Sequence, residues 1–526
     1  MACAVVLAAA PASASAEGGA ALAWGRNAEY QLGAGYKTYF GIGGEPSPVA
    51  VSELHNITEL AAGGGWNLAL LSSGTVRAWG GNTFGQLGNG THEGTVEEGH
   101  GEEPEEEGVE EQKSTVSGLS EVQQISAAGA HGLALLKGGE VMAWGTDQDG
   151  ELGNKTSGTE TERQKIAEEK HESWESQLTP KTVKGLEHVV QIASGGASNY
   201  AVLEGGKEVV AWGSNTKGQL GIGEEGSGKA KPEVCKTEVG EQPCSTIPRR
   251  VLLPKLPEGV TVKAVSAGEV AAYALLSNGH VLAWGDNGKG ALGTGGKTTN
   301  YYTPQEVAEL SNAVAVSGGA EQGLAVLESG EVDGWGVTEG GDLGETSSEE
   351  ECQKVACYKT PRHLKGLEHI KAVSAGTDFS LALTEGGKVY AFGRNKYGKL
   401  GTGSMEEKSN VPTPINVNAE TFPVSAIAAG IHDGVALLRG GVAAPAPLVS
   451  LVPKSKSLEV TWTLGAPETK IEVHIHPANK EKSKEVSKFT FFGPQTHLFE
   501  GFRSEPYVVN VIDNKVFRAV VGTPLP

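Results

Sequence analysis

The sequence predicts an all-β protein: a seven-bladed β-propeller followed by a small β-sandwich. The chain has 76 glycines among 526 residues, about twice the usual share, which indicates many tight turns between short strands. One pattern, Ala-Trp-Gly, a polar turn and Leu-Gly, recurs along the chain at intervals of roughly 50–70 residues. This spacing is typical of propellers and solenoids.

The repeated aromatic residues are expected to pack between blades as part of the scaffold. They are Trp24, Trp79, Trp144, Trp212, Trp284, Trp335 and Phe392. A second pattern, two small residues or glycines followed by an Ala-Leu run, precedes each Trp-Gly segment after the first. A short turn such as Ser73-Gly74 joins the two patterns, which indicates a β-hairpin because glycine supplies the positive φ of tight turns.

The two ends of the array favour a closed ring over an open solenoid. The chain enters with a Trp-Gly half at Ala23 and leaves with an Ala-Leu half at 428–438. These halves complement each other, so we expect the N- and C-terminal half-repeats to share the seventh blade. An open solenoid would need polar caps, whereas a ring protects its strand edges by closure. The propeller is therefore placed at 21–441.

These repeats resemble those of the regulator-of-chromosome-condensation family, in its secreted bacterial form. The resemblance is carried by segments such as AWGGNTFGQLG from Ala78 and AAGAHGLALL from Ala127, and it covers about four-fifths of the chain. It implies the propeller fold but says little about function, because these motifs are scaffold. The family includes secreted propellers that inhibit β-lactamases and a nuclear guanine-nucleotide exchange factor for a small GTPase.

Ligand contacts are expected where the blades differ. Where the family commonly has a His, this chain has Trp66, His131, Ser198, Ala271, Gln322, Phe379 and Asp433. Such varied side chains exclude a symmetric metal ring or catalytic array, and they predict one asymmetric face that recognises a protein or cell-surface ligand. The candidate contacts are Trp66, His131, Tyr200 and Phe379, since binding hot spots favour aromatic anchors. Packing inside the blades is the alternative interpretation.

Residues 1–16 are interpreted as a signal peptide, so a secreted protein is expected. Their apolar stretch is too short to span a bilayer, and Ala14-Ser15-Ala16 supplies a small-residue cleavage pattern. No basic residue precedes Arg26, so the basic region of such signals is missing. A disordered Ala-rich tail is the alternative.

The cysteines agree with an oxidising compartment. Beyond Cys3 they form two local pairs, Cys235 with Cys244 and Cys352 with Cys357. Closely spaced pairs in a secreted chain predict two disulfides. Zinc is the alternative, but neither pair has the C-x-x-C-like spacing of a zinc site.

The balance of 43 basic and 64 acidic residues, a net charge of −21, argues against a non-specific nucleic-acid binder. A dense acidic run at residues 93–111 is interpreted as a solvated loop, with loose cation binding or recognition of a basic partner as alternatives. The insertion at 159–176 has the composition of a short helix.

The end of the chain predicts a separate domain. Residues 442–447 read as a Pro-rich linker, and 448–526 contain alternating strands that resemble a fibronectin type III module with Trp462 in its core. His474 and His476 share one strand face, but no third metal ligand is evident.

Catalytic motifs are missing from the sequence. It contains no G-x-S-x-G, no H-E-x-x-H and no complete EF-hand loop. The segment from Asp147 to Gly150 resembles half a calcium loop but falls in a repeat turn. We therefore predict a secreted, non-catalytic binding protein without metal or cofactor, of which a β-lactamase inhibitor is one version. Nucleotide exchange on a small GTPase is the alternative, and an enzyme of unrecognised type is a third.

Overall fold

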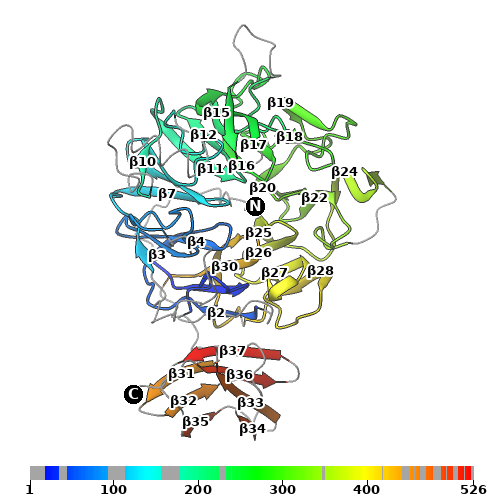
Figure 1. Cartoon of the computed structure of the whole chain (residues 1–526). Helices are drawn as coiled ribbons and strands as arrows, with labels where there is room; N and C mark the ends of the chain where they lie inside the picture. Colours follow the sequence, from blue (N-terminus) through cyan, green and yellow to red (C-terminus); the bar gives the residue numbers. More distant parts are fainter. Residues whose placement is uncertain are drawn as a thin grey trace.

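A computed structural model describes residues 18–34, 44–92, 113–155, 178–223, 233–237, 240–345, 350–417 and 419–440, together with seven backbone strands between 449 and 522. The all-β fold and the seven-bladed propeller are confirmed: seven sheets surround a common centre (Figure 1). The first strand of each sheet contacts the first strand of the next, and β29 contacts β3 in the same way. Among the described residues, no helix is long and apolar enough to cross a membrane.

Six blades are continuous in sequence. Blade 1 comprises β3 (Ile57–Ala62), β4 (Trp66–Leu71), β5 (Val76–Gly80) and β6 (Ser114–Thr115). Blade 2 comprises β7 (Val122–Ala127), β8 (His131–Leu136), β9 (Val141–Gly145) and β10 (Lys181–Thr182). Blade 3 comprises β11 (Val189–Gly195), β12 (Ser198–Leu203), β13 (Val209–Ser214), β15 (Gly240–Arg250) and β14 (Val234–Thr237). Blade 4 comprises β16 (Val262–Ala267), β17 (Ala271–Leu276), β18 (Val281–Asp286) and β19 (Asn300–Glu306). Blade 5 comprises β20 (Ala313–Gly318), β21 (Gln322–Leu327), β22 (Val332–Val337), β24 (Val355–His363) and β23 (Glu351–Cys352). Blade 6 comprises β25 (Ile370–Ala375), β26 (Phe379–Thr384), β27 (Val389–Arg394) and β28 (Lys408–Pro414).

Blade 7 combines strands from both ends of the propeller. Its order is β29 (Val424–Ala429), β30 (Asp433–Leu438), β1 (Ala21–Gly25) and β2 (Glu45–Ala50). β1 pairs with β30 in antiparallel register, with Leu22 opposite Ala436.

The Trp-Gly step of the third strands has a clear backbone reason for its glycine. Gly80 has φ +100, and a Cβ atom there would lie 2.6 Å from the carbonyl oxygen of Gly65. Glycine tolerates both the positive φ and the close approach. In blades 3 to 7 the pairing of the third strand with the fourth shifts register at this step, so it coincides with a β-bulge.

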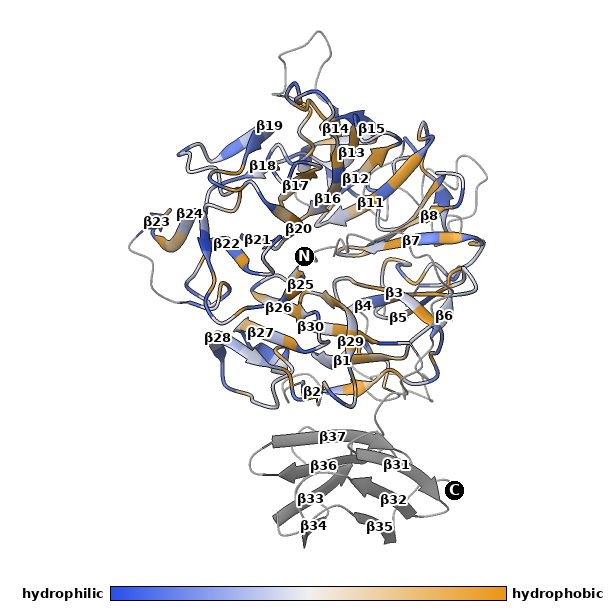
Figure 2. Ribbon diagram, turned by 180° about the vertical axis from the view of Figure 1, so that it is seen from behind, coloured by the Kyte–Doolittle hydropathy of each residue, from blue (hydrophilic) through white to orange (hydrophobic). Residues whose placement is uncertain are grey.

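The apolar core lies between neighbouring blades, and hydrophobic residues are spread along the inner strands (Figure 2). All seven repeated aromatic residues are fully buried. Each tryptophan also donates its indole N–H to a backbone carbonyl in the preceding blade. For example, Trp79 Nε1 lies 3.0 Å from the oxygen of Gln31, and Trp24 Nε1 lies 2.9 Å from that of Lys399. Phe392 has no N–H, and there the Oγ of Ser380 donates to the oxygen of Asp342 at 2.8 Å.

Both predicted disulfides are confirmed. Cys235 is bonded to Cys244 and Cys352 to Cys357. Each pair fastens the outermost hairpin of its blade, β14–β15 in blade 3 and β23–β24 in blade 5. The two hairpins pack against the preceding blades, since Lys155 N donates to the oxygen of Thr246 at 3.0 Å, and Gly295 N to that of Lys359 at 2.9 Å.

The C-terminal strands form two antiparallel sheets, β31-β32-β35 and β34-β33-β36-β37. Their bounds are β31 (Val449–Lys454), β32 (Ser457–Trp462), β33 (Lys470–Pro477), β34 (Ser487–Phe492), β35 (Gln495–Glu500), β36 (Tyr507–Asp513) and β37 (Val516–Gly522). His474 and His476 are two positions apart in β33, as expected for one face. The predicted signal peptide, the acidic segment 93–111, the predicted helix 159–176 and the linker 442–447 lie outside the described residues.

Candidate ligand-binding face

The four candidate ligand residues lie inside the propeller, so this prediction is wrong for the described conformation. Trp66, His131, Tyr200 and Phe379 have no exposed surface, and a side chain without exposed surface cannot contact a ligand. Tyr273, at the position in blade 4 that Tyr200 occupies in blade 3, is buried as well.

Two of these side chains form hydrogen bonds to the next blade. Trp66 Nε1 donates to the oxygens of Ala128 and Gly129 in blade 2, at 3.1 and 3.0 Å. His131 Nε2 lies 2.8 Å from Asn199 Oδ1 in blade 3. Their variety reflects different solutions to packing between blades, because the first residue of the second strand bonds to the next blade in blades 1, 2, 5 and 7.

The turns between the third and fourth strands are built on a repeated pair of side-chain caps. In blade 3, Asn215 Oδ1 accepts the N–H of Leu220 at 3.1 Å, and Gln219 Oε1 accepts the N–H of Lys217 at 2.8 Å. Equivalent pairs occur in the turns at 27–31 and 82–86. These caps satisfy buried amides that would otherwise be costly.

The sequence departs from the Gln cap in four blades. The residues at this position are Glu151, Ala291, Asp342 and Lys399. Glu151 keeps the cap, since its Oε2 accepts the N–H of Asp149 at 2.7 Å. Burial, then the charges of Asp149 and Asp147, raises the pKa of Glu151 to about 8. It is therefore largely protonated at neutral pH and takes the place of the amide. The half calcium loop is thus a turn, as expected.

Lys399 is the most unusual of the four, because it is an ammonium group with no exposed surface. It forms an ion pair with Asp378 of the same blade and lies 5.3 Å from the centre of the Phe379 ring. Burial lowers the pKa of Lys399, and Asp378 opposes this effect. Having no acceptor oxygen, Lys399 cannot cap the turn as Gln219 does.

The turn that contains Lys399 also has an unusual backbone. Its 3-10 segment Lys396–Gly398 places Tyr397 at φ +66. This left-handed conformation is costly for a bulky residue, and such residues concentrate at functional sites.

Basic and aromatic side chains gather around Tyr397, at the junction of blades 6 and 7. The ring lies 4.9 Å from Lys396 Nζ, 5.9 Å from Arg26 Cζ and 5.5 Å, edge to face, from the ring of His432. We call Arg26, Lys396, Tyr397 and His432 the Tyr397 cluster. Arg26 also pairs with Glu29 at 3.2 Å, while Lys396 and the neighbouring Arg394 are exposed.

The electrostatics of this junction follow from burial beside many charges. Burial, then the cation of Lys399, lowers the pKa of His432 to about 4, so the imidazole is neutral at pH 7. Burial, reinforced by Asp378, raises the pKa of Asp342 to about 7. Burial also raises the pKa of Asp433 to about 7, although Asn67 donates a hydrogen bond to this carboxyl.

Most of the buried polar atoms without a hydrogen-bond partner in the described residues lie on blades 5, 6, 7 and 1. Within the described chain, those on blades 5, 6, 7 and 1 are Gln31 Nε2, Asn67 Oδ1, Arg77 Nε, Thr338 Oγ1, Asp342 Oδ1, Thr377 Oγ1, Asn410 Oδ1, His432 Nδ1 and Asp433 Oδ1. Such atoms are rare in proteins and each requires an explanation.

The hairpins between the first and second strands carry different residues at their tips around the ring, small or apolar on some blades and polar on others. In blades 1 to 7 the residue before the second strand is Gly65, Ala130, Ala197, Val270, Glu321, Asp378 and His432. We call this end of the blades, with the capped turns beside it, the turn face. The tips with polar side chains lie on blades 5 to 7. Lys289 Nζ of blade 4 pairs with Glu321 of blade 5 at 2.8 Å.

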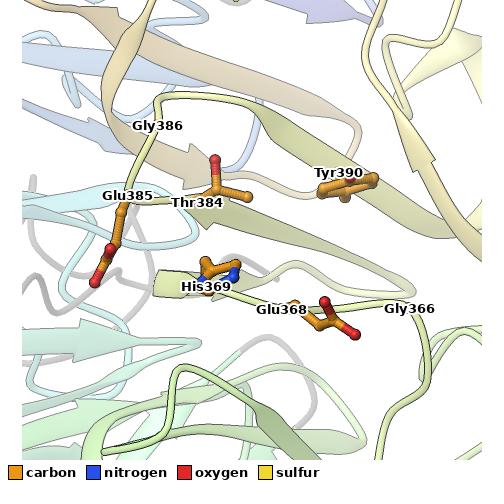
Figure 3. Close-up of a pocket in the computed structure, with 7 residues that line it drawn as sticks. All are labelled: Gly366, Glu368, His369, Thr384, Glu385, Gly386 and Tyr390. Carbon is orange, nitrogen blue, oxygen red and sulfur yellow. The ribbon is translucent and has the colours of Figure 1, made fainter.

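A shallow pocket lies at the opposite end of the strands of blade 6 (Figure 3). Its lining is Gly366, Glu368, His369, Thr384, Glu385, Gly386 and Tyr390. Most of these residues are exposed, and their polar groups do not converge on one point (Figure 3). Among the described residues, no group of three or more His, Cys, Asp or Glu side chains is placed to hold a metal ion.

Sequence reasoning missed Lys399, Asp342 and the Tyr397 cluster. A signal existed: Lys399 and Asp342 break the Gln-Leu-Gly step at a position that the repeat predicts to be buried.

Comparison with known proteins identifies the fold family. A family model described as RCC1-like domain matches residues 170–444, and the regulator of chromosome condensation (RCC1) repeat matches residues 18–70, 73–135 and 57–86. The chain belongs to the RCC1-like domain family. The predicted resemblance is confirmed at this level.

RCC1-like relatives include proteins of different function. The chain is 27% identical to the ultraviolet-B receptor UVR8 of Arabidopsis thaliana over 60% of its own length and 63% of that protein. It is 27% identical to the human E3 ubiquitin-protein ligase HERC2, over 80% of this chain but 8% of HERC2. It is 26% identical to the regulator of chromosome condensation of Xenopus laevis, over 80% of this chain and 90% of that protein. The chain thus spans less than two thirds of the first two.

Solved RCC1-like structures share the fold. The structure of Prp20p from Saccharomyces cerevisiae, described with its binding properties to Gsp1p and histones, matches with a TM-score of 0.62 and 22% identity, over 81% of this chain and 92% of that one. Human WBSCR16 matches with a TM-score of 0.61 and 19% identity, over 81% and 100%.

Proposed function

We propose that this chain is a non-catalytic binding protein that recognises a partner protein with the turn face of its propeller. The observation that carries the proposal is that polar tip residues are confined to some of the blades on that face. Blades 1 to 3 present glycine or alanine at the hairpin tips, whereas blades 5 to 7 present Glu321, Asp378 and His432. Turns held on a rigid scaffold are the usual location of recognition residues.

Relatives give the proposal further support. Two solved structures of one relative, Prp20p of yeast, are described with protein partners: Gsp1p and histones in one, and Kap60 in the other. Complementary charge across a contact contributes specificity and association rate, which fits a face built from ion pairs such as Lys289 with Glu321.

The test is a quantitative binding assay with the full chain immobilised against extracellular and cell-wall fractions. We expect Glu321→Ala to weaken capture of the partner, and we expect Glu385→Ala, an exposed carboxylate at the other end of the blades, to leave it unchanged. Equal effects of the two substitutions would contradict the assignment of the turn face.

Secretion and inhibition of a β-lactamase are the finer parts of the proposal. The two disulfides support an oxidising compartment, and the apolar start of the chain supports export. Mass spectrometry of the mature N-terminus tests cleavage after Ala16, and a β-lactamase assay tests inhibition. Intact Met1 on exported protein, or full hydrolysis at saturating propeller, would refute the respective part.

Nucleotide exchange on a small GTPase remains the second candidate function. Similarity to the regulator of chromosome condensation over 90% of its length supports it. Release of a fluorescent guanine nucleotide from purified small GTPases tests it, and acceleration by the full chain would replace the non-catalytic proposal.

We also infer that blade 7 closes the ring and that the C-terminal region is a fibronectin type III-like spacer. Pairing of β1 with β30 supports closure, and the division of strands into β31-β32-β35 and β34-β33-β36-β37 supports the sandwich. If closure is required, removing residues 1–25 will abolish cooperative unfolding of the propeller, whereas removing residues 448–526 will leave it intact.

A further inference from the structure

We propose that the Tyr397 cluster binds the carboxylate groups of an acidic peptide segment on the partner protein. This inference rests on the proposed function and specifies the chemistry of the partner. It is carried by the geometry of three basic or imidazole groups around one tyrosine ring.

The cluster is a local basic site on a strongly acidic protein. Lys396 and Arg26 both lie over the Tyr397 ring, at 4.9 and 5.9 Å, and exposed Arg394 adds a third cation on the same turn. The whole chain carries −21. Cations held on a ring face keep most of their charge available to an anion, because the ring is not itself an anion.

Nearby acids favour carboxylates over more highly charged ligands. Glu29 and Asp378 pair with Arg26 and Lys399, so the site retains only a small positive excess. A small excess suits carboxylates spread along a peptide, each of which carries one charge, whereas nucleic-acid sites need clustered Lys and Arg.

His432 adds an imidazole ring to the cluster. Its ring lies against Tyr397, and Lys399, Asp378, Arg26 and Lys396, from blades 6 and 7, all act on its charge. Its Nδ1 atom is buried without a partner in the described chain. An incoming carboxylate would offset the cations around the ring, so the pKa of His432 is expected to rise on binding.

The backbone at Tyr397 differs from that at the equivalent position of the other blades. The equivalent residues Glu29, Phe84, Asp149, Lys217 and Lys289 do not have positive φ values, whereas Tyr397 does. A glycine would adopt this conformation without steric cost. Retaining a tyrosine here therefore indicates that the ring has a use that offsets its cost.

The experiment measures binding of a fluorescein-labelled hexaglutamate peptide to the full chain by fluorescence anisotropy. We expect saturable binding that weakens as salt rises, and roughly tenfold weaker binding by Lys396→Ala, the loss typical of one charge-assisted hydrogen bond. The matched control is Lys217→Ala, which removes the same charge from the equivalent turn of blade 3 and should bind as the parent does.

The variant Tyr397→Gly separates recognition from folding. We expect it to bind the peptide at least several-fold more weakly while its thermal midpoint of unfolding stays equal or rises. NMR of the histidine rings provides a second readout, since hexaglutamate should raise the titration midpoint of His432.

Several results would overturn this inference while leaving the proposed function standing. These are capture of a partner protein without any hexaglutamate binding, equal binding by Lys396→Ala and Lys217→Ala, and tighter binding of a single-stranded oligonucleotide than of hexaglutamate. Conversely, hexaglutamate binding at the cluster without any partner protein would support the site and refute the wider proposal.

Discussion

Two turns of the same repeat, residues 215–219 in blade 3 and residues 395–399 in blade 6, differ in what their last side chain does. In both, the asparagine caps the following leucine amide, at 3.1 and 3.0 Å. In both, the backbone oxygen of the last residue accepts an indole N–H from the next blade, Trp284 at 2.8 Å and Trp24 at 2.9 Å. The side chain of the last residue differs in its role: Gln219 caps the turn, whereas Lys399 forms an ion pair with Asp378.

The comparison teaches that the scaffold relies on the backbone carbonyl of this position and not on its side chain. Gln219 O serves both Trp284 and the hydroxyl of Tyr200, and any residue supplies such an oxygen. The side chain is therefore free to vary, and blade 6 uses this freedom to bury a cation beside the Tyr397 cluster.

The largest expected effect comes from removing the buried cation. Lys399→Met leaves Asp378 and Asp342 beside an apolar side chain, and we expect the free energy of unfolding to fall by about 2–4 kcal/mol, as measured by urea denaturation. Lys217→Met is the control, because its pair with Asp286 is 3.5 Å long and partly exposed, worth at most about 1 kcal/mol. Equal losses would contradict the distinction between the turns.

The asparagine cap is common to both turns, so its removal should lower the free energy of unfolding by similar amounts in blades 3 and 6. Asn215→Ala and Asn395→Ala each leave a buried leucine amide without its cap, which costs about 1–3 kcal/mol. The urea midpoints of the two variants should shift by comparable amounts. A loss confined to one blade would mean that the asparagine cap is not a common structural element.

Asp342 and Glu151, which replace the glutamine of the cap, should make the stability of the fold decrease as pH rises. A carboxylate in a salt bridge would have the opposite effect. Burial raises the pKa of Asp342 from 3.8 to about 7, so the folded state holds a proton that the unfolded state has lost. Stability should therefore fall as pH rises from about 4 to about 7. Asp342→Asn removes this dependence, and its advantage over the parent should reach the order of 2 kcal/mol near pH 7.

Glu151→Gln supplies the matched comparison for this pH effect. Because the pKa of Glu151 is raised to about 8, the advantage of the variant should keep growing to about pH 8, one unit beyond that of Asp342→Asn. Unfolding curves between pH 4 and 9 measure both. Parallel curves for parent and variants over the whole range would refute the burial effect.

The smallest expected effect concerns the backbone of the blade 6 turn. Tyr397→Gly should gain about 0.5 kcal/mol, since relief of the left-handed conformation slightly exceeds the added entropy of the unfolded glycine. Phe84→Gly in blade 1 should lose about 1 kcal/mol, because Phe84 has no positive φ to relieve. Differential scanning calorimetry of the pair tests the sign of the difference.

The fold was predictable in some detail because its signals are local. The Trp-Gly and Ala-Leu segments of one blade are joined by hairpins of a few residues, and the cysteine pairs are separated by 9 and 5 positions. The site was not predictable by the same route. The repeat pattern predicts Trp66 as a surface anchor, whereas its indole bonds to Gly129 in the next blade, a contact that no periodicity within one repeat reveals.

The sequence by itself determined the number of blades, the identity of the packing tryptophans and the pairing of the cysteines, since each depends on spacing along the chain. Only the tertiary structure decided which side chains face the neighbouring blade and which face solvent. It also brought Arg26 from the start of the propeller to Tyr397 and His432 near its end. The physical reason is that inter-blade contacts join residues a blade or a whole ring apart in sequence, and their geometry exists only once the blades are packed.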